Sequence, residues 1–406
     1  MKILFIHNDY MRPSGEEHAA QALAGLLEGQ GHQVSWYRRS SKELEGKPLK
    51  KIMAFFSGFY NPLATWQVKK LIQDTRPDLV QIQNLYPLIS PSVLRPIKRA
   101  GIPIVMRCPN YRLFCPTGLH LDRKGRLCER CTGPGRELNC IGKNCEKSLI
   151  KSIAYALRGF AARKYWRMHK LVDVFIVQTE FQRQKFILNG IPAHKLGIVH
   201  GLSPAIQGTK AAEIGDLVTF VGRASPEKGI LEFLHAARAL PKIPFAVAGR
   251  LPEELSHLKR DSPKNVEWLG FLGAKALDET YRRTRIITAP GKWYEGFPNV
   301  ITRAMQHGKP VITSNLGAMA SIVDHGENGW LVEPGNARKL AQAINLLYWD
   351  PLRCKDLGNN GREKAAEHYS QGEVYAALLA IYRTVVPDVP FDLSPATPPR
   401  PSCQSL

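Results

Sequence analysis

The chain has 406 residues, of which 44% are hydrophobic and 22% charged. A chain of this length is too long to fold around one hydrophobic core, which indicates two or three domains. The composition is that of a globular protein and excludes a disordered or fibrous one. No apolar run approaches the roughly 20 residues that span a bilayer. The opening residues, MKILFIHNDY, have too short an apolar core for a secretory signal and predict a buried strand, so a cytoplasmic protein is expected.

The net charge of +21 is concentrated in the first half of the chain. Residues 1–200 hold 32 Lys and Arg against 14 Asp and Glu, a surplus of 18, whereas residues 201–406 hold 24 against 21. Such asymmetry favours an anionic partner for the first half: nucleic acid, an acidic membrane surface or a phosphorylated acceptor. A solvated basic surface without a dedicated partner is the alternative.

Short apolar runs alternate with helical segments through the first half, which predicts a parallel, Rossmann-like sheet. The expected strands are Ile3–Ile6, Val34–Tyr37, Leu79–Ile82, Ile104–Met106 and Phe175–Val177, and the expected helices are Glu17–Gly29, Ala64–Thr75 and Ser92–Ala100, the last with Ser90 as its cap. Gly15 precedes the first helix, where its backbone freedom would let a ligand approach the helix N-terminus. Every such unit needs a turn here, so a purely structural role is the alternative.

The segment from Cys108 to Cys145 departs from this alternation, because it is polar and rich in Gly and Arg. It contains six of the eight cysteines, and without a secretory signal a disulfide framework is disfavoured. A structural zinc site is therefore predicted, and it would hold an otherwise irregular insertion together. Its expected ligands are Cys115, Cys128, Cys131 and Cys145, with Cys140 as a substitute; free or partly oxidised thiols and redox chemistry are the alternatives.

After the insertion, one long basic helix is expected from Leu149 to about Lys170, either packed on the domain or lying on an anionic membrane. A second alternation of strands and helices begins near Asp216, after a polar linker around residues 201–215. Its expected strands are Leu217–Val221, Phe245–Ala248, Val266–Leu269, Ile286–Thr288, Val311–Thr313 and Trp330–Val332, and the closing helices are Ala337–Tyr348, Leu352–His368 and Gln371–Val385. The Pro-rich end is expected to be disordered.

Two loops of the second half carry residues suited to a nucleotide sugar. Arg223 and Lys228 lie in VGRASPEKG, between a strand and a helix that begins near Gly229, so that both cations and the helix start can face one anion. Glu295 and Gly296 precede a short helix from Asn299 to about His307; a carboxylate can hold sugar hydroxyls, and the N–H groups at a helix start can hold phosphate oxygens. Solvated loop cations and an ordinary strand-to-helix loop are the alternatives.

These loops resemble the donor site of family 4 glycosyltransferases, which are retaining enzymes of the GT-B fold. The likeness lies in GRASPEKG, in YEGFPNVITRAMQHGKPV, and in further segments such as QNLYPLISPSVL, NYRLFCP and GENGWLVEPGN, so that it covers nearly all of residues 1–385. It implies that Arg223 and Lys228 clamp the leaving diphosphate and that Glu295 orients the sugar. The implied donor-binding residues are Gly15, Gly222, Gly296, Phe297, Pro298, Asn299, Val300 and Arg303.

Two positions depart from the family pattern. Where many relatives have a His before N-Y-R-L, this chain has Pro109, and where the second carboxylate of the family stands, it has Arg303. A carboxylate at this position accepts hydrogen bonds from ribose hydroxyls, whereas the guanidinium of Arg303 can only donate them. Arg303 is therefore expected either to bind a carboxylate or phosphate of a different sugar donor or to turn to solvent. A catalytically degenerate nucleotide-sugar binder or partner subunit is the alternative that these departures raise.

The sequence thus predicts an α/β protein of GT-B architecture, with two Rossmann-like doubly wound domains facing a cleft. The expected domains are residues 1–205, with the Cys-rich insertion at 108–147; residues 206–370, which bind the donor; a helix at 371–386 that crosses back to the first domain; and a tail at 387–406. The expected reaction moves a hexose from a nucleotide diphosphate sugar to a glycan or lipid-linked glycan, without a catalytic metal cofactor. The protein is expected either free in the cytoplasm or peripheral on the inner face of the plasma membrane, and nucleic acid is not expected as a partner.

Overall fold

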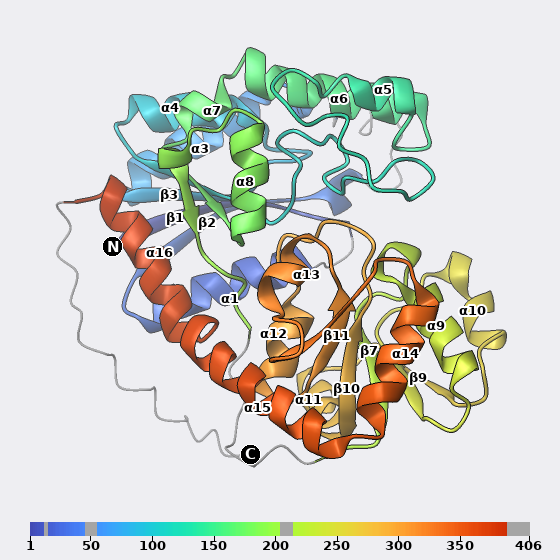
Figure 1. Cartoon of the computed structure of the whole chain (residues 1–406). Coiled ribbons are helices and arrows are strands. Elements are labelled where there is room, and N and C mark those ends of the chain that lie inside the picture. Colours follow the sequence, from blue (N-terminus) through green and yellow to red (C-terminus); the bar gives the residue numbers. More distant parts are fainter. Residues whose placement is uncertain (12–14, 45–54, 204–213, 388–406) are drawn as a thin grey trace, which may run out of the picture.

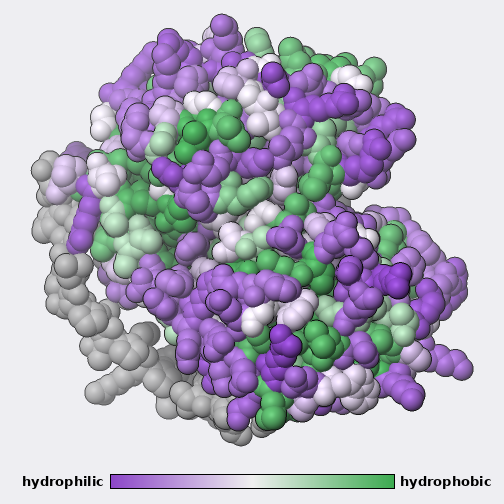
Figure 2. Space-filling model, viewed as in Figure 1, coloured by the Kyte–Doolittle hydropathy of each residue, from purple (hydrophilic) through white to green (hydrophobic). Residues whose placement is uncertain are grey.

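The computed structural model describes residues 1–11, 15–44, 55–203 and 214–387. The Pro-rich tail and most of the expected linker lie outside these residues. Two sheets of six parallel strands form the centres of two halves, which lie one above the other in Figure 1. The space-filling view shows the molecule hollowed between the halves on one side (Figure 2).

The first sheet has the strand order β2-β1-β3-β4-β5-β6. Its strands are β1 (Lys2–Asp9), β2 (Gln33–Ser40), β3 (Leu79–Asn84), β4 (Ile104–Arg107), β5 (Val174–Val177) and β6 (Leu196–Ile198). The helices of this half are α1 (Gly15–Gly29), α3 (Pro62–Thr75), α4 (Leu94–Arg99), α5 (Asn139–Lys143), α6 (Leu149–Lys164), α7 (Met168–Leu171) and α8 (Glu180–Leu188). The strands are buried on both faces: Leu4 and Ile6 face one core cluster and Ile3 and Phe5 the other.

The second sheet has the order β12-β11-β10-β7-β8-β9. Its strands are β7 (Leu217–Val221), β8 (Phe245–Ala248), β9 (Val266–Gly270), β10 (Thr284–Ala289), β11 (Val311–Ser314) and β12 (Gly329–Val332). Its helices are α9 (Ile230–Ala239), α10 (His257–Arg260), α11 (Ala274–Arg283), α12 (Asn299–Gln306), α13 (Gly317–Ile322), α14 (Ala337–Tyr348) and α15 (Pro351–His368). Two further core clusters cover its two faces.

The last helix, α16 (Gln371–Val385), packs on the first half. Its buried residues Val374, Leu378 and Tyr382 share a core cluster with β1, and the Tyr382 hydroxyl donates to the Gln81 side chain in β3. In Figure 1, α15 and α16 follow one another along one side of the molecule, from the second half to the first. The two halves are therefore tied together by this helix as well as by the linker.

The strand order of each sheet indicates where a ligand would bind in that half. In the first sheet the order reverses between β1 and β3, and in the second between β7 and β10. In open α/β sheets, ligands bind outside the carboxyl ends of the strands at such switch points. The expected donor loops follow β7 and β10, the two strands that flank the switch point of the second sheet.

The structure confirms the predicted doubly wound fold and corrects two helices. The expected helix from Leu149 to Lys170 ends at Lys164; Arg167 then adopts a left-handed conformation with φ of +50°, and the short α7 follows. The expected helix Ser92–Ala100 begins as a 3-10 turn at Pro91–Val93, capped by Ser90, before α4. Within the described residues, no helix combines the length and the apolar content needed to cross a membrane.

Candidate active site

Two loops of the second half meet at the carboxyl edge of its sheet. The loop after β7 carries Arg223 and Lys228, and the loop after β10 carries Glu295. Lys228 Nζ lies 2.7 Å from Glu295 Oε1. The loops pack closely, since a Cβ on Gly229, which has φ of +84°, would lie 2.0 Å from the carbonyl oxygen of Pro290. The structure thus brings together Lys228 and Glu295, which the sequence placed in separate motifs.

Both cations of the first loop already pair with carboxylates. Arg223 lies 2.5 Å from Glu227 Oε1, and its side chain is 56% exposed. Lys228 is more enclosed and lies 5.1 Å from the centre of the Trp293 ring. Gly222 precedes Arg223 with φ of +132°, a conformation that favours glycine. An incoming diphosphate could therefore replace the carboxylate partners, and Arg223 has the freedom to turn toward it.

Glu295 is held by groups from both halves of the chain. Its carboxylate is 11% exposed and accepts hydrogen bonds from Lys228 and from Trp293 Nε1, the latter at 3.1 Å. Its backbone carbonyl accepts from the Tyr111 hydroxyl of the first half at 3.3 Å. Burial raises the pKa of Tyr111, so this hydroxyl stays protonated and donates. Glu295 is thus fixed in orientation, as a group that positions a substrate must be.

The helix start after Glu295 offers fewer donors than expected. Pro298 has no N–H group, and the Asn299 N–H is donated to the Phe297 carbonyl at 3.1 Å. Among the described residues, the N–H groups of Phe297 and Val300 have no such acceptor. The Phe297 ring packs between His200 and Tyr369, with centroids 5.5 and 5.7 Å away. Phe297 is therefore available to a ligand through its backbone rather than its side chain.

Arg303 faces a carboxylate of its own domain rather than the solvent. It lies 2.7 Å from Asp278 Oδ1 of α11, and its side chain is 14% exposed, which excludes the expectation that it turns outward. His307 also approaches Asp278, at 3.0 Å, and stacks on the Tyr281 ring. Burial alone would raise the pKa of Asp278, but the hydrogen bond and charge of Arg303 hold that pKa below its ordinary value.

Pro109 of the first half contacts the loop that carries Glu295. A Cβ on Gly296 would lie 2.1 Å from the Pro109 carbonyl oxygen, so the two backbones are in direct contact and only glycine fits here. Gly15 behaves differently: a Cβ there would meet none of the described atoms within 4 Å. Gly296 is therefore required by packing, whereas the space beside Gly15 is open at the start of α1.

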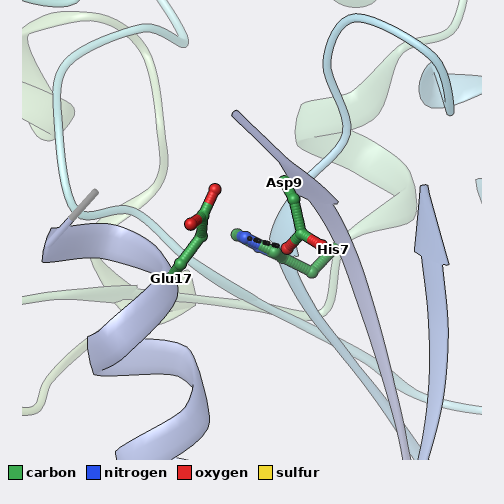
Figure 3. A group of neighbouring side chains, drawn as sticks. All are labelled: His7, Asp9 and Glu17. Carbon is green, nitrogen blue, oxygen red and sulfur yellow. Dashed lines mark ion pairs between the residues drawn. The ribbon is translucent and has the colours of Figure 1, made fainter. Parts of the chain in front are cut away.

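A group that the sequence analysis missed lies where β1 ends and α1 begins (Figure 3). His7, Asp9 and Glu17 place one side-chain atom each within 4.8 Å of one another. His7 Nε2 lies 3.3 Å from Asp9 Oδ1, Asp9 also pairs with Arg38 at 2.8 Å, and Glu17 accepts from the Tyr10 N–H at 2.5 Å. Because both carboxylates have protein partners, we assign this group to anchoring α1 on β1. The i, i+2 spacing of His7 and Asp9 on a strand was the available signal.

The cysteines of the insertion lie near one another, and Cys115, Cys128 and Cys145 are close enough to Cys131 to affect its pKa. Cys131 and Cys140 are buried in a small cluster with Ala156, and burial, reinforced by neighbouring thiols, raises the pKa of Cys131 to about 12. A four-thiolate zinc site needs sulfurs about 4 Å apart. In the described part of the chain, however, no three of these cysteines place their sulfur atoms within 4.8 Å of one another. The arrangement of Cys115, Cys128, Cys131, Cys140 and Cys145 therefore lends the zinc prediction no support.

Comparison with known proteins matches residues 206–364 to the family model "Glycosyl transferases group 1". An uncharacterised 42.6 kDa protein from the cps region of Klebsiella pneumoniae is 26% identical over 279 residues, which are 68% of this chain and 67% of that protein. The phosphatidyl-myo-inositol mannosyltransferase of Mycobacterium leprae is 30% identical over 198 residues, 46% of this chain and 51% of that protein. The chain thus aligns with about two thirds of the first relative and half of the second.

Among solved structures, Anabaena HepE in complex with UDP-glucose has a TM-score of 0.66 and 18% identity, over 95% of this chain and 100% of that one. The likeness extends over both halves, whereas the family model covers the second half, where the loops of Lys228 and Glu295 meet. The chain therefore has the GT-B fold, and its residues 206–364 are similar to the group 1 glycosyl transferases.

Proposed function

We propose that the protein is a retaining glycosyltransferase that moves a hexose from a nucleotide diphosphate sugar to a hydroxyl of a glycan or lipid-linked glycan. The observation that carries this proposal is the meeting of Lys228 and Glu295 at the switch point of the second sheet, with Arg223 on the same loop as Lys228. The solved relative with UDP-glucose and the relatives named for capsule and mannosyl transfer support a role in polysaccharide or glycolipid synthesis.

In this proposal the cations bind the diphosphate of the donor, and the carboxylate binds its sugar. Arg223 and Lys228 bind the leaving diphosphate and stabilise the negative charge that develops on it. Glu295 accepts hydrogen bonds from sugar hydroxyls, and the N–H groups of Phe297 and Val300 face the donor. The acceptor hydroxyl attacks on the same face as the departing diphosphate, whose oxygen takes the proton, so that the anomeric configuration is kept.

The test is nucleotide release from a panel of UDP- and GDP-sugars with glycan acceptors. Arg223→Ala and Lys228→Ala should each lower kcat about 100-fold, because each removes a cation from the developing charge. Lys242→Ala is the matched control: Lys242 is exposed and precedes β8, at the opposite edge of the same sheet, so turnover should not change. The anomeric configuration of the product, read by NMR, should match that of the donor.

Two results would contradict the proposal. Binding of a nucleotide sugar with measurable heat but without release, for every donor and acceptor, would identify the degenerate binder. An inverted product would exclude the retaining mechanism.

We also propose that the insertion binds structural zinc and that the basic first half contacts an anionic membrane surface from the cytoplasmic side. What supports the first is the concentration of thiols in a segment with little regular structure. What supports the second is the surplus of 18 positive charges in residues 1–200.

A further inference from the structure

A pocket lies at the carboxyl edge of the first sheet. It encloses about 560 Å³ of empty space, part of it open to solvent, between the ends of β3 and β4 and the helix α6. The charged side chains in its wall are Glu16, Arg107, Arg112 and Arg158. This pocket belongs to the half of the chain that the donor loops do not occupy.

The pocket has more positive charge than its own carboxylate can neutralise. Three guanidinium groups face one carboxylate, that of Glu16, which accepts from the Tyr10 hydroxyl and from Asn110 Nδ2, each at 2.7 Å. Within the described residues, none of the three arginines has a carboxylate oxygen within the 4.0 Å of an ion pair. Glu146, outside the wall, is a second carboxylate whose charge interacts with those of Arg112 and Arg158. The three guanidinium groups therefore outnumber the two carboxylates by one positive charge in a partly enclosed space.

Arg107 shows most clearly that a partner is missing. It is the last residue of β4, it is 3% exposed, and its Nε has no hydrogen-bond acceptor in the described part of the chain. Burial lowers the pKa of Arg107 to about 10, so the group is still charged at neutral pH. Buried charges and buried donors are normally paired, because leaving them unpaired costs free energy.

Arg112 and Arg158 also line the pocket, and their contacts there are with a tyrosine hydroxyl and with aromatic rings rather than with carboxylates. Arg112 Nη1 donates to the Tyr10 hydroxyl at 2.9 Å. The guanidinium of Arg158 lies 4.1 and 4.4 Å from the ring centres of Tyr86 and Tyr155. Stacking on aromatic rings fixes the plane of a guanidinium and leaves its N–H edge able to bind an oxyanion.

The same wall adjoins the candidate donor loop. Pro109 and Asn110 line the pocket, and the Pro109 carbonyl is in contact with Gly296, next to Glu295. A molecule held in the pocket therefore lies beside the loop that is proposed to hold the donor sugar. This is the position that an acceptor must occupy.

We propose that this pocket binds an oxyanion of the acceptor, a carboxylate or a phosphate, through Arg107, Arg112 and Arg158. Guanidinium forks match the paired oxygens of both groups. The identification of the ligand as the acceptor rests on the proposed glycosyltransferase activity, which this inference deepens by naming an anionic class of acceptor. The binding of an oxyanion at the pocket does not depend on that activity.

The experiment is a calorimetric titration of the protein saturated with UDP, so that the donor site does not compete. The probes are methyl glucuronide, glycerol phosphate and inorganic pyrophosphate, which distinguish a sugar acid from a phosphate monoester and a diphosphate. Arg158→Gln and Arg107→Gln should weaken binding of the preferred probe at least about tenfold, because each removes a charged hydrogen-bond donor. Lys164→Gln is the matched control, an exposed cation of the same helix, and should bind as the wild type does.

UDP affinity, measured on every variant, reports whether the protein is folded and tests the donor site separately. If Arg107→Gln loses UDP binding as well, Arg158→Gln decides the question, because Arg158 is less buried than Arg107. Failure of UDP-saturated wild type to bind any probe, or equal affinity in Arg158→Gln and Lys164→Gln, would overturn the oxyanion pocket and leave the donor site unaffected. Probe binding without UDP binding would instead retain the pocket and contradict the proposed function.

Discussion

At the scale of single residues, Arg303 shows how a substitution in a donor motif is accommodated. Its guanidinium reaches Asp278 of α11, at 2.7 Å, and its Nε is buried without an acceptor among the described residues. The charge that replaces the family's carboxylate is therefore neutralised within the domain. This pairing makes Arg303 a structural residue as well as a candidate donor contact.

Replacing Arg303 by glutamate should destabilise the protein. Arg303→Glu breaks the ion pair and places a second carboxylate beside Asp278, so the melting temperature should fall by about 5 to 10 °C at pH 7. The difference in melting temperature between the variant and the wild type should be smaller in acid. Because the pKa of Asp278 is lowered, its ion pair stabilises the wild type fully above the ordinary pKa of 3.8, and this stabilisation is lost as the pH falls below that value and Asp278 is protonated. Differential scanning fluorimetry at pH 7 and pH 3.5 measures both effects.

The matched control is Arg282→Glu, which breaks the exposed pair between Arg282 and Glu279 on the same helix as Asp278. An exposed pair contributes little, so its effect should stay within about 2 °C. Equal losses for the two variants would show that the pair of Arg303 and Asp278 contributes no more than a surface ion pair.

At the scale of elements, the sequence predicted most strands because they are short, apolar and buried on both faces. It also predicted the cap at Ser90, since a cap depends on neighbours in the chain. It could not predict the break at Arg167, where a non-glycine residue adopts a left-handed conformation that the local sequence does not indicate. The arginine pocket was missed for the same reason: Arg107, Arg112 and Arg158 meet only once β4 and α6 are packed.

The Cys-rich insertion gives a prediction at this scale. Purified protein is expected to contain one zinc per chain, measured by mass spectrometry, and to lose it when Cys128 and Cys131 are changed to serine. The melting temperature should fall with the metal, because the segment has only α5 as regular structure and a small cluster of buried residues. The control Cys354→Ser changes a buried thiol of the second half. Metal content near zero with all thiols reduced would exclude the site.

At the scale of the whole molecule, the net positive charge lies mostly in the first half of the chain. The second half is nearly neutral, and its donor loops pair each cation with a carboxylate. The first half has the surplus, both in the arginine pocket and on its surface. This surplus in the first half suits the anionic acceptor proposed above and an anionic surface on which such an acceptor would be anchored.

The first half also exposes apolar side chains beside its cations. On α3, Leu63 and Trp66 are 52% and 60% exposed, and Lys70 lies 6.0 Å from the centre of the Trp66 ring. These residues follow one another at helical spacing, so that they share one face. Tryptophan and lysine together are typical of side chains at a membrane interface. The face of α3 is therefore where we expect the protein to meet an anionic bilayer.

This expectation is tested by vesicle flotation at low and high salt. The protein should bind vesicles that contain phosphatidylglycerol in 20 mM salt, release them at about 500 mM, and ignore neutral vesicles, because the attraction between charged surfaces is screened by salt. Trp66→Ala should reduce binding several-fold, whereas Trp349→Ala, which removes a tryptophan 61% exposed in the second half, should not. Absence of binding at low salt would contradict the membrane contact and favour a solvated basic surface.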